Sequence, residues 1–145
     1  MSQFTRRLAV GVVGACAALG VAAGPAAAYP TVDFNVCNPY CDPDTEQGFV
    51  DGSITWYNRT AGVTGGVESY FEDGRPTTAY FDAYAGSVKI DSDHRTAANG
   101  SRRGFNFTIG DTNLEGGINR IKITVCTLVN GDPKYCSTPM NYTRP

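Results

Sequence analysis

The segment 118–142 has the pattern of a β-hairpin whose two arms are joined by a disulfide. Apolar and polar side chains alternate along its first arm, as the strand of a half-buried sheet requires. The turn residues 130–132, Asn-Gly-Asp, tolerate positive φ angles, and Gly131 is equidistant in sequence from Cys126 and Cys136. We therefore expect these two cysteines to lie opposite each other and to form a cross-strand disulfide.

The first 28 residues have the organisation of a secretory signal peptide. A basic start precedes the apolar stretch 8–24, and three consecutive alanines that end at Ala28 provide a small-residue cleavage site. The apolar stretch is shorter than the ~20 residues that a membrane-spanning helix needs, and glycines interrupt it. We expect cleavage near Ala28, secretion, and a mature chain without a membrane span. A lipid anchor at Cys16 and twin-arginine export are less favoured alternatives.

The mature chain, 29–145, has the length of one small domain. Its first part, 29–52, is expected to combine a strand with a disulfide loop and an acidic linker. Arg6 and Arg7 belong to the leader, so the mature chain holds 10 Lys and Arg against 14 Asp and Glu, a formal charge of −4. This acidic balance makes nucleic acid a poor candidate partner.

Four cysteines remain in the mature chain, and an even number in a secreted domain indicates two disulfides. The sequence excludes none of the three possible pairings. We favour the local bridges Cys126 with Cys136 and Cys37 with Cys41, although a bridge from the N-terminal segment to the hairpin would close a longer loop. Structural zinc is disfavoured because C-x2-C spacing is lacking and the mature chain has one histidine. We expect no metal and no cofactor.

The remainder of the mature chain alternates short apolar-polar repeats with turn residues, and no persuasive apolar repeat occurs at helical spacing. The hairpin follows strands that the period-2 pattern predicts over 31–36, 53–57, 63–71, 78–85, 88–90 and 105–109. Seven or eight short strands at this spacing predict an all-β chain, folded as a single immunoglobulin-like β-sandwich. Segment 92–103 is expected to be a strand end and a loop, and the tail 141–145 is expected to fray.

Large apolar residues on the inward faces of these strands form the expected core. They are Val32, Phe34, Ile54, Trp56, Val63, Val67, Phe71, Phe81, Val88, Ile90, Phe105, Phe107, Ile109, Ile121, Ile123 and Val125. Their burial contributes about 30 kcal/mol in total, most of which the conformational entropy of folding offsets. Two disulfides, at ~2–4 kcal/mol each, are then a meaningful share of the net stability, so we expect the fold to weaken on reduction.

Tyr80, Asp82 and Tyr84 share the outward face of one predicted strand and form the first candidate site. Two aromatic faces with a carboxylate between them can stack against a sugar ring and accept hydrogen bonds from its hydroxyl groups. Tyr57 and Tyr70 have the same expected outward direction and are candidates to extend this patch. The alternative, which is the commoner arrangement, is cross-strand packing of the tyrosines on the sheet surface.

The tip of the hairpin is the second candidate site, with Asn130, Asp132 and Lys134 as its polar side chains. A loop held by the expected disulfide between Cys126 and Cys136 loses little conformational entropy when it binds, which is the device of small protein inhibitors. The candidate partners of this chain are therefore an extracellular polysaccharide or an extracellular protein.

No catalytic constellation stands out, so we do not expect an enzyme. His94, the only histidine, has no activated nucleophile or G-x-S-x-G motif to accompany it and is interpreted as an exposed strand-end residue. The acidic linker begins like a calcium-binding EF-hand loop but lacks its glycine and its final glutamate; its acids are Asp42, Asp44 and Glu46. Hydrolysis by an acid pair is a minor alternative, with Glu72 and Asp73 or Asp111 and Glu115 as the pairs.

The leader rich in Ala, Gly and Val, together with segments 53–59, 83–87 and 116–126, resembles small secreted proteins of high-GC actinobacteria. The resemblance covers most of the mature chain and transfers no activity and no functional residue. The sequence thus predicts a secreted, disulfide-stabilised, non-catalytic binding or surface protein whose ligand is a polysaccharide or cell-wall polymer. The alternative is an inhibitor or protein-binding module that uses the hairpin tip.

Overall fold

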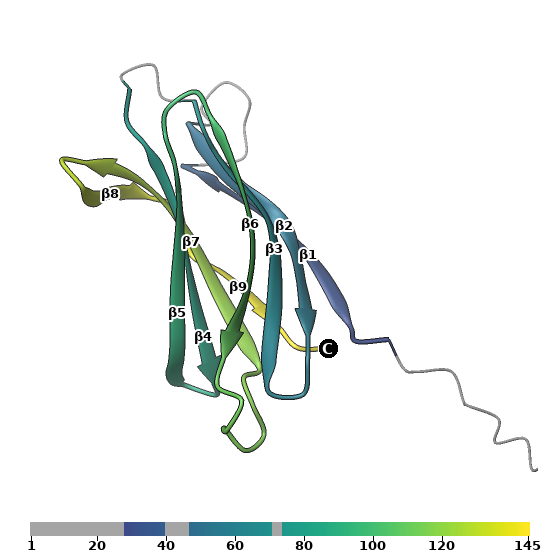
Figure 1. The fold of residues 1–145 in the computed structure, drawn as a ribbon. Helices are drawn as coiled ribbons and strands as arrows, with labels where there is room; N and C mark the ends of the chain where they lie inside the picture. The colour runs from purple at the N-terminus through teal and green to yellow at the C-terminus, as the bar shows by residue number, and fades with distance from the viewer. Residues whose placement is uncertain (1–27, 40–46, 71–73) are drawn as a thin grey trace, which may run out of the picture.

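The computed structural model describes residues 28–39, 47–70 and 74–145. These residues form strands and turns without any helix, so the all-β prediction is confirmed (Figure 1). The strands are β1 (Thr31–Asn38), β2 (Gly48–Trp56), β3 (Thr60–Ser69), β4 (Thr77–Ala85), β5 (Val88–Ala97), β6 (Arg102–Gly110), β7 (Arg120–Val129), β8 (Asp132–Cys136) and β9 (Met140–Thr143).

The strands make two antiparallel sheets that lie face to face as two layers (Figure 1). Sheet A has the order β1-β2-β3-β6, and sheet B has the order β5-β4-β7-β8. Strand β9 also pairs with β7. It lies beside the first half of β7, whereas β8 lies beside the second half of β7. Ser137 lies where the two partners meet, and its hydroxyl accepts a hydrogen bond from the Val125 N–H at 3.0 Å. A side chain therefore continues the hydrogen bonding of β7 across the gap.

Most of the predicted core is confirmed between the two sheets. The buried members are Phe34, Ile54, Trp56, Val63, Val67, Phe81, Ile109, Ile121, Ile123 and Val125, and the partly buried ones at its margin are Val32, Ile90, Phe105 and Phe107. The prediction omitted seven other buried residues, most of which are alanines or lie outside the predicted strands: Val36, Val50, Ala61, Ala79, Ala83, Ala97 and Ile118. Phe71 lies outside the described residues.

Val88 was wrongly placed in the core, because its side chain is 61% exposed. A two-residue turn, Gly86-Ser87, sets Val88 opposite Ala85 at the very end of the β4–β5 hairpin. A register shift after Ala83 then leaves Ile90 without a direct partner on β4. This β-bulge changes which later residues of β5 face the core, and a strict period-2 pattern does not anticipate it.

Three segments that were predicted as loop or tail belong to strands. Residues 48–52 open β2 and pair with both β1 and β3, residues 92–97 continue β5, and residues 141–143 pair with β7 as part of β9. The first segment contains two glycines and an aspartate, and the others are largely polar, so they lack the apolar alternation of a half-buried strand. Pairing with neighbouring strands, rather than local propensity, makes them β-structure.

The polar character of β5 has a structural reason, since β5 is an edge strand of sheet B. Asp93 and Arg95 lie opposite the buried Phe81 and Ala79 and form an ion pair on the inward side. The guanidinium of Arg95 lies 4.3 Å from the centre of the Phe107 ring on β6, in sheet A. Inward-pointing charges discourage an edge strand from pairing with another chain, and here they also close the side of the sandwich between β5 and β6.

The predicted disulfide between Cys126 and Cys136 is confirmed, but its register has a different origin. The turn is Asn130-Gly131, both with positive φ, and this two-residue turn alone would place Tyr135 opposite Cys126. Tyr135 instead occupies a bulge with φ 37°, which moves Cys136 into register with Cys126. The bulge is therefore what makes the bridge possible. The predicted partner of Cys37, Cys41, lies outside the described residues, so that bridge stays a prediction.

Replacing Cys126 and Cys136 together by alanine is expected to lower the free energy of unfolding by about 2–3 kcal/mol, because the bridge closes a short loop in the unfolded chain. Denaturant unfolding followed by the fluorescence of Trp56, the single and buried tryptophan, measures the change. The oxidised parent and the reduced parent are the controls. An unchanged midpoint in the double variant would contradict a stabilising role for the bridge.

Candidate functional site

The three residues of the first candidate site lie together on the outward face of β4, as the alternation predicted. Tyr80 is half-buried and stacks on His94 of the neighbouring strand, with 6.0 Å between the ring centres and 30° between the ring planes. The carboxylate of Asp82 forms ion pairs with the ammonium groups of Lys89, at 3.3 Å, and of Lys122, at 3.0 Å. Two of the three side chains thus already have partners on the strands at either side.

Tyr84 is covered by cations from β7. The guanidinium of Arg120 lies 4.2 Å from the ring centre and the ammonium of Lys122 lies 5.5 Å from it. Hydrogen bonds to Tyr84 and then to Asp82 raise the pKa of Lys122 above its ordinary value. This surface is therefore a charge-paired cross-strand cluster, which is the alternative that the sequence left open.

Tyr57 and Tyr70 do not extend this patch, and that prediction is wrong. Tyr57 directly follows β2 and Tyr70 directly follows β3, both in sheet A, whereas Tyr80 and Tyr84 belong to sheet B. Because the core lies between the sheets, the outward faces of the two sheets point in opposite directions. The alternation identified outward positions correctly but contains no information about which layer carries them.

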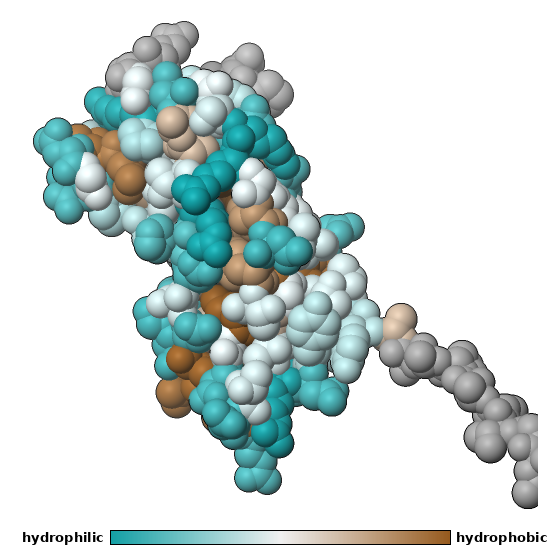
Figure 2. Space-filling view, in the orientation of Figure 1, coloured by the Kyte–Doolittle hydropathy of each residue, from teal (hydrophilic) through white to brown (hydrophobic). Residues whose placement is uncertain are grey.

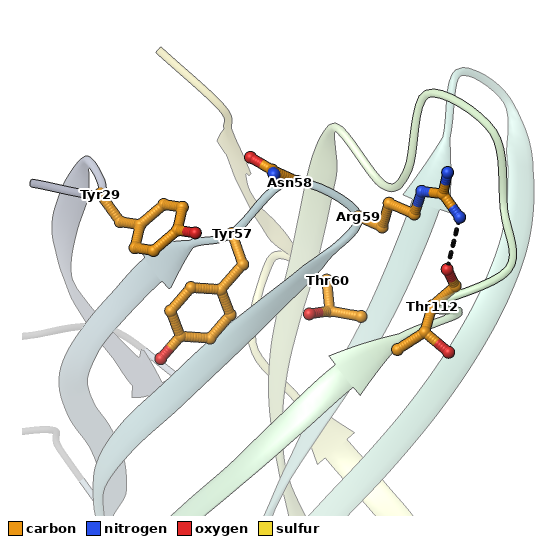
Figure 3. A pocket seen from close by; sticks show the side chains of 6 residues that line it. All are labelled: Tyr29, Tyr57, Asn58, Arg59, Thr60 and Thr112. Atoms are coloured by element: carbon orange, nitrogen blue, oxygen red, sulfur yellow. Dashed lines mark hydrogen bonds between the residues drawn. The ribbon is translucent and has the colours of Figure 1, made fainter. Parts of the chain in front are cut away.

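A hollow of about 390 Å³ opens beside Tyr57, at the end of sheet A that carries the β2–β3 turn (Figure 3). Its walls come from three parts of the chain: Tyr29 before β1, the β2–β3 turn with the residue at either side of it, and the loop after β6. The lining residues are Tyr29, Tyr57, Asn58, Arg59, Thr60 and Thr112.

The aromatic wall of the hollow is held by backbone contacts. Tyr57 donates its N–H to the carbonyl of Thr60 at 2.9 Å across the two-residue turn. Its ring lies against Gly62, where an added Cβ would come within 2.8 Å of the tyrosine Oη. Tyr29 meets the Tyr57 ring edge to face, with 5.1 Å between their centres. A glycine on β3 thus leaves room for the hydroxyl edge of the Tyr57 ring.

Polar groups form the opposite wall of the hollow. Arg59 donates a hydrogen bond to the carbonyl oxygen of Thr112 at 2.8 Å, and Thr60 lies between this pair and the tyrosines (Figure 3). Tyr29 and Tyr57 remain 51% and 36% exposed. The hollow therefore offers aromatic surface together with hydroxyl, amide and guanidinium groups to a ligand.

Sequence reasoning identified Tyr57 as outward-facing but missed Tyr29, Arg59 and Thr112. Tyr29 directly follows the expected cleavage site, and the other two lie in turns, where no periodic pattern exists to place them. The one available signal was the short turn Asn58-Arg59 beside an aromatic residue. Only the pairing of the strands in sheet A brings these side chains together.

The hairpin tip lies on an arm that stands apart from the two layers (Figure 1). Asn130, Asp132 and Lys134 are exposed, as is every other residue of β8. Tyr135 at the bulge is 68% exposed, and the guanidinium of Arg75 lies 5.9 Å from its ring centre. Strand β8 and the turn before it are therefore accessible along their whole length.

The residues considered for catalysis are not gathered into one place within the described part of the chain. His94 stacks on Tyr80, and the carboxylate of Asp111 accepts a hydrogen bond from the Asn113 N–H at 2.8 Å within its own turn. Across residues 28–39, 47–70 and 74–145 there is no group of three or more side chains able to hold a metal ion. The acids Asp42, Asp44, Glu46, Glu72 and Asp73 lie outside the described residues.

Apolar side chains on the side shown in Figure 2 form separate patches among polar ones.

Comparison with protein-family models, curated proteins and solved structures finds no match to this chain. No helix in the described segments is long and apolar enough to cross a membrane.

Proposed function

We propose that this chain is a secreted, non-catalytic protein that binds polysaccharide through the hollow beside Tyr57. The observation that supports this most directly is the pair of exposed tyrosine rings, Tyr29 and Tyr57, which line an open hollow together with hydroxyl, amide and guanidinium side chains. A sugar ring has an apolar face that stacks on an aromatic ring and a rim of hydroxyl groups that form hydrogen bonds.

The face of Tyr80, Asp82 and Tyr84 offers less to a ligand than the hollow does. Cations cover the Tyr84 ring, and Lys89 and Lys122 pair with Asp82. A sugar would have to displace charged partners to reach either group. In the hollow, by contrast, the tyrosines retain exposed surface.

Export and an immunoglobulin-like fold belong to the same proposal. Cleavage near Ala28 makes Tyr29 the first residue of the mature chain, at the rim of the hollow.

The strand pairing in the two sheets supports an immunoglobulin-like order. Strands β2, β3 and β6 then correspond to strands A, B and E, and strands β5, β4, β7 and β8 correspond to strands C′, C, F and G. Strand β1 is then an additional strand at the edge of the first sheet.

The variants Tyr29→Ala and Tyr57→Ala are each expected to weaken binding about tenfold, because each removes one stacking surface. Pull-down on insoluble cellulose, chitin and xylan, with depletion isotherms for whichever polymer the parent binds, measures the loss. The matched control is Tyr80→Ala with Tyr84→Ala, which removes two tyrosines from the opposite face. If both hollow variants bind the polymer as well as the parent does while the control loses binding, the polysaccharide site lies on sheet B and not in the hollow.

Recognition of a protein partner by Asn130, Asp132 and Lys134 is the second candidate function, favoured by the exposure of β8 and by the disulfide that joins β8 to β7. The same pull-down discriminates between the two candidates when it includes a variant with all three tip residues replaced by alanine. Under the polysaccharide proposal this variant binds glycan as the parent does.

A further inference from the structure

The outward face of sheet A continues from the hollow as a surface of small side chains. Cross-strand partners form successive rows on β2, β3 and β6, and the middle row is Ser53, Thr64 and Asn106. The rows at either side have a glycine on β3, Gly62 in one and Gly66 in the other. Thr64 and Asn106 are exposed. The middle of this face therefore carries only small side chains and presents hydroxyl and amide groups.

The two glycines each leave room for a planar group from a neighbouring residue. The edge of the Tyr57 ring lies against Gly62. Arg102 of β6 lies on Gly66, where an added Cβ would come within 2.7–2.8 Å of its Nε, Cζ and Nη2 atoms. Since Gly62 and Gly66 are four residues apart on β3, the two planar groups are separated by ~13 Å along the strand.

Arg102 is held in this position by its neighbours. It donates hydrogen bonds to the carboxylates of Asp51 and Glu68, the latter at 3.2 Å, and its guanidinium lies 5.6 Å from the centre of the Phe49 ring. The hydrogen bond to Asp51 is the largest of the effects that raise the pKa of Arg102. A guanidinium held in place loses little entropy when a ligand stacks on it, and the two carboxylates leave the group with a net charge of −1.

We propose that this face is a track for an extended, neutral polysaccharide, which starts in the hollow at Tyr57, crosses the row of Ser53, Thr64 and Asn106, and stacks on Arg102. This inference rests on the proposed function and adds the class of polymer. The small side chains leave room for a ribbon-like chain, and the planar groups at both ends can stack on separate sugar rings. Hydroxyl and amide groups between them match sugar hydroxyls, whereas an acidic polymer would meet the carboxylates of Asp51 and Glu68.

The test compares long and short ligands of one sugar. The polymer used is whichever of cellulose, chitin and xylan binds the parent protein. Arg102→Ala is expected to weaken binding to this polymer about tenfold. Binding of the disaccharide of the same sugar, measured by calorimetry, should stay unchanged because it occupies only the hollow. Arg103→Ala is the matched control, since Arg103 pairs with the inward-facing Val67 and donates to the carbonyl of Thr96 at 3.4 Å.

A second variant, Thr64→Ala with Asn106→Ala, removes two polar groups from the middle of the track and is expected to weaken polymer binding about tenfold. This variant replaces the Arg102 variant in the test if the latter does not fold. Folding of each variant is checked by its unfolding midpoint, measured by Trp56 fluorescence. Polymer binding equal to the parent in the folded variants overturns the track, while loss in Tyr57→Ala leaves the proposed function standing. A preference for the acidic polymer polygalacturonate would also overturn it. A parent that binds no glycan overturns both.

Discussion

Replacing Gly65 with alanine is expected to lower the free energy of unfolding by at least ~3 kcal/mol. Gly65 faces the core in the middle of β3, and an added Cβ would lie 2.0 Å from the backbone oxygen of Asp51 and 2.9 Å from the Cα of Gly52. Both neighbours are backbone atoms of β2, so the clash can be relieved only by separating two paired strands. Denaturant unfolding followed by Trp56 fluorescence measures the loss.

Gly104→Ala is the matched control, because Gly104 is also a strand glycine of sheet A. Its added Cβ would have a single close neighbour, the carbonyl oxygen of Gly65 at 3.8 Å, which is an ordinary contact. Alanine is favoured over glycine inside a strand by about 0.5–1 kcal/mol, so this variant should be as stable as the parent or slightly more stable. Equal losses in both variants would contradict a specific close approach at Gly65.

Replacing Phe81 with alanine is expected to cost about 3–5 kcal/mol, the range for removing a buried aromatic side chain. Phe81 of sheet B is fully buried, and its ring centre lies 6.2, 5.4 and 5.2 Å from those of Phe34, Phe105 and Phe107 in sheet A. Its removal leaves these three rings without their common partner, and the two paired sheets have limited freedom to close the cavity.

The conservative variant Phe81→Leu retains most of the buried volume and is expected to lose clearly less stability than Phe81→Ala. Thermal and denaturant unfolding of the two variants provide the comparison. A loss below 1 kcal/mol for Phe81→Ala would mean that the sheets repack readily, contrary to the aromatic cluster described here.

The same cluster explains the glycines beneath it. Phe34, Gly52, Gly65 and Phe105 are successive cross-strand partners on the inward face of sheet A. The two glycines separate the rings of Phe34 and Phe105, and Phe81 of the opposite sheet contacts both rings. Glycines that look like weak points in the strand pattern are thus part of the packing between the layers.

Local pattern was sufficient for much of this fold because strand alternation and turn chemistry act over a few residues. The Cys126–Cys136 bridge and most of the inward-facing residues followed from it. It failed where the deciding contact was distant: β5 is polar because its inward charges face Phe107 of the other sheet, and β9 exists because β7 has a free edge. The bulge at Tyr135, which sets the register of the bridge, left no mark in the spacing.

For the candidate site, the sequence by itself determined that Tyr57, Tyr80 and Tyr84 point outward and that Asn130 and Gly131 turn the hairpin, because these properties depend on neighbouring residues alone. Only the tertiary structure decided that Tyr57 and Tyr80 lie on opposite faces of the molecule and that Tyr29, Arg59 and Thr112 share one hollow. The physical reason is that alternation specifies one side of a strand, while the sheet that receives the strand is chosen by burial of the whole core.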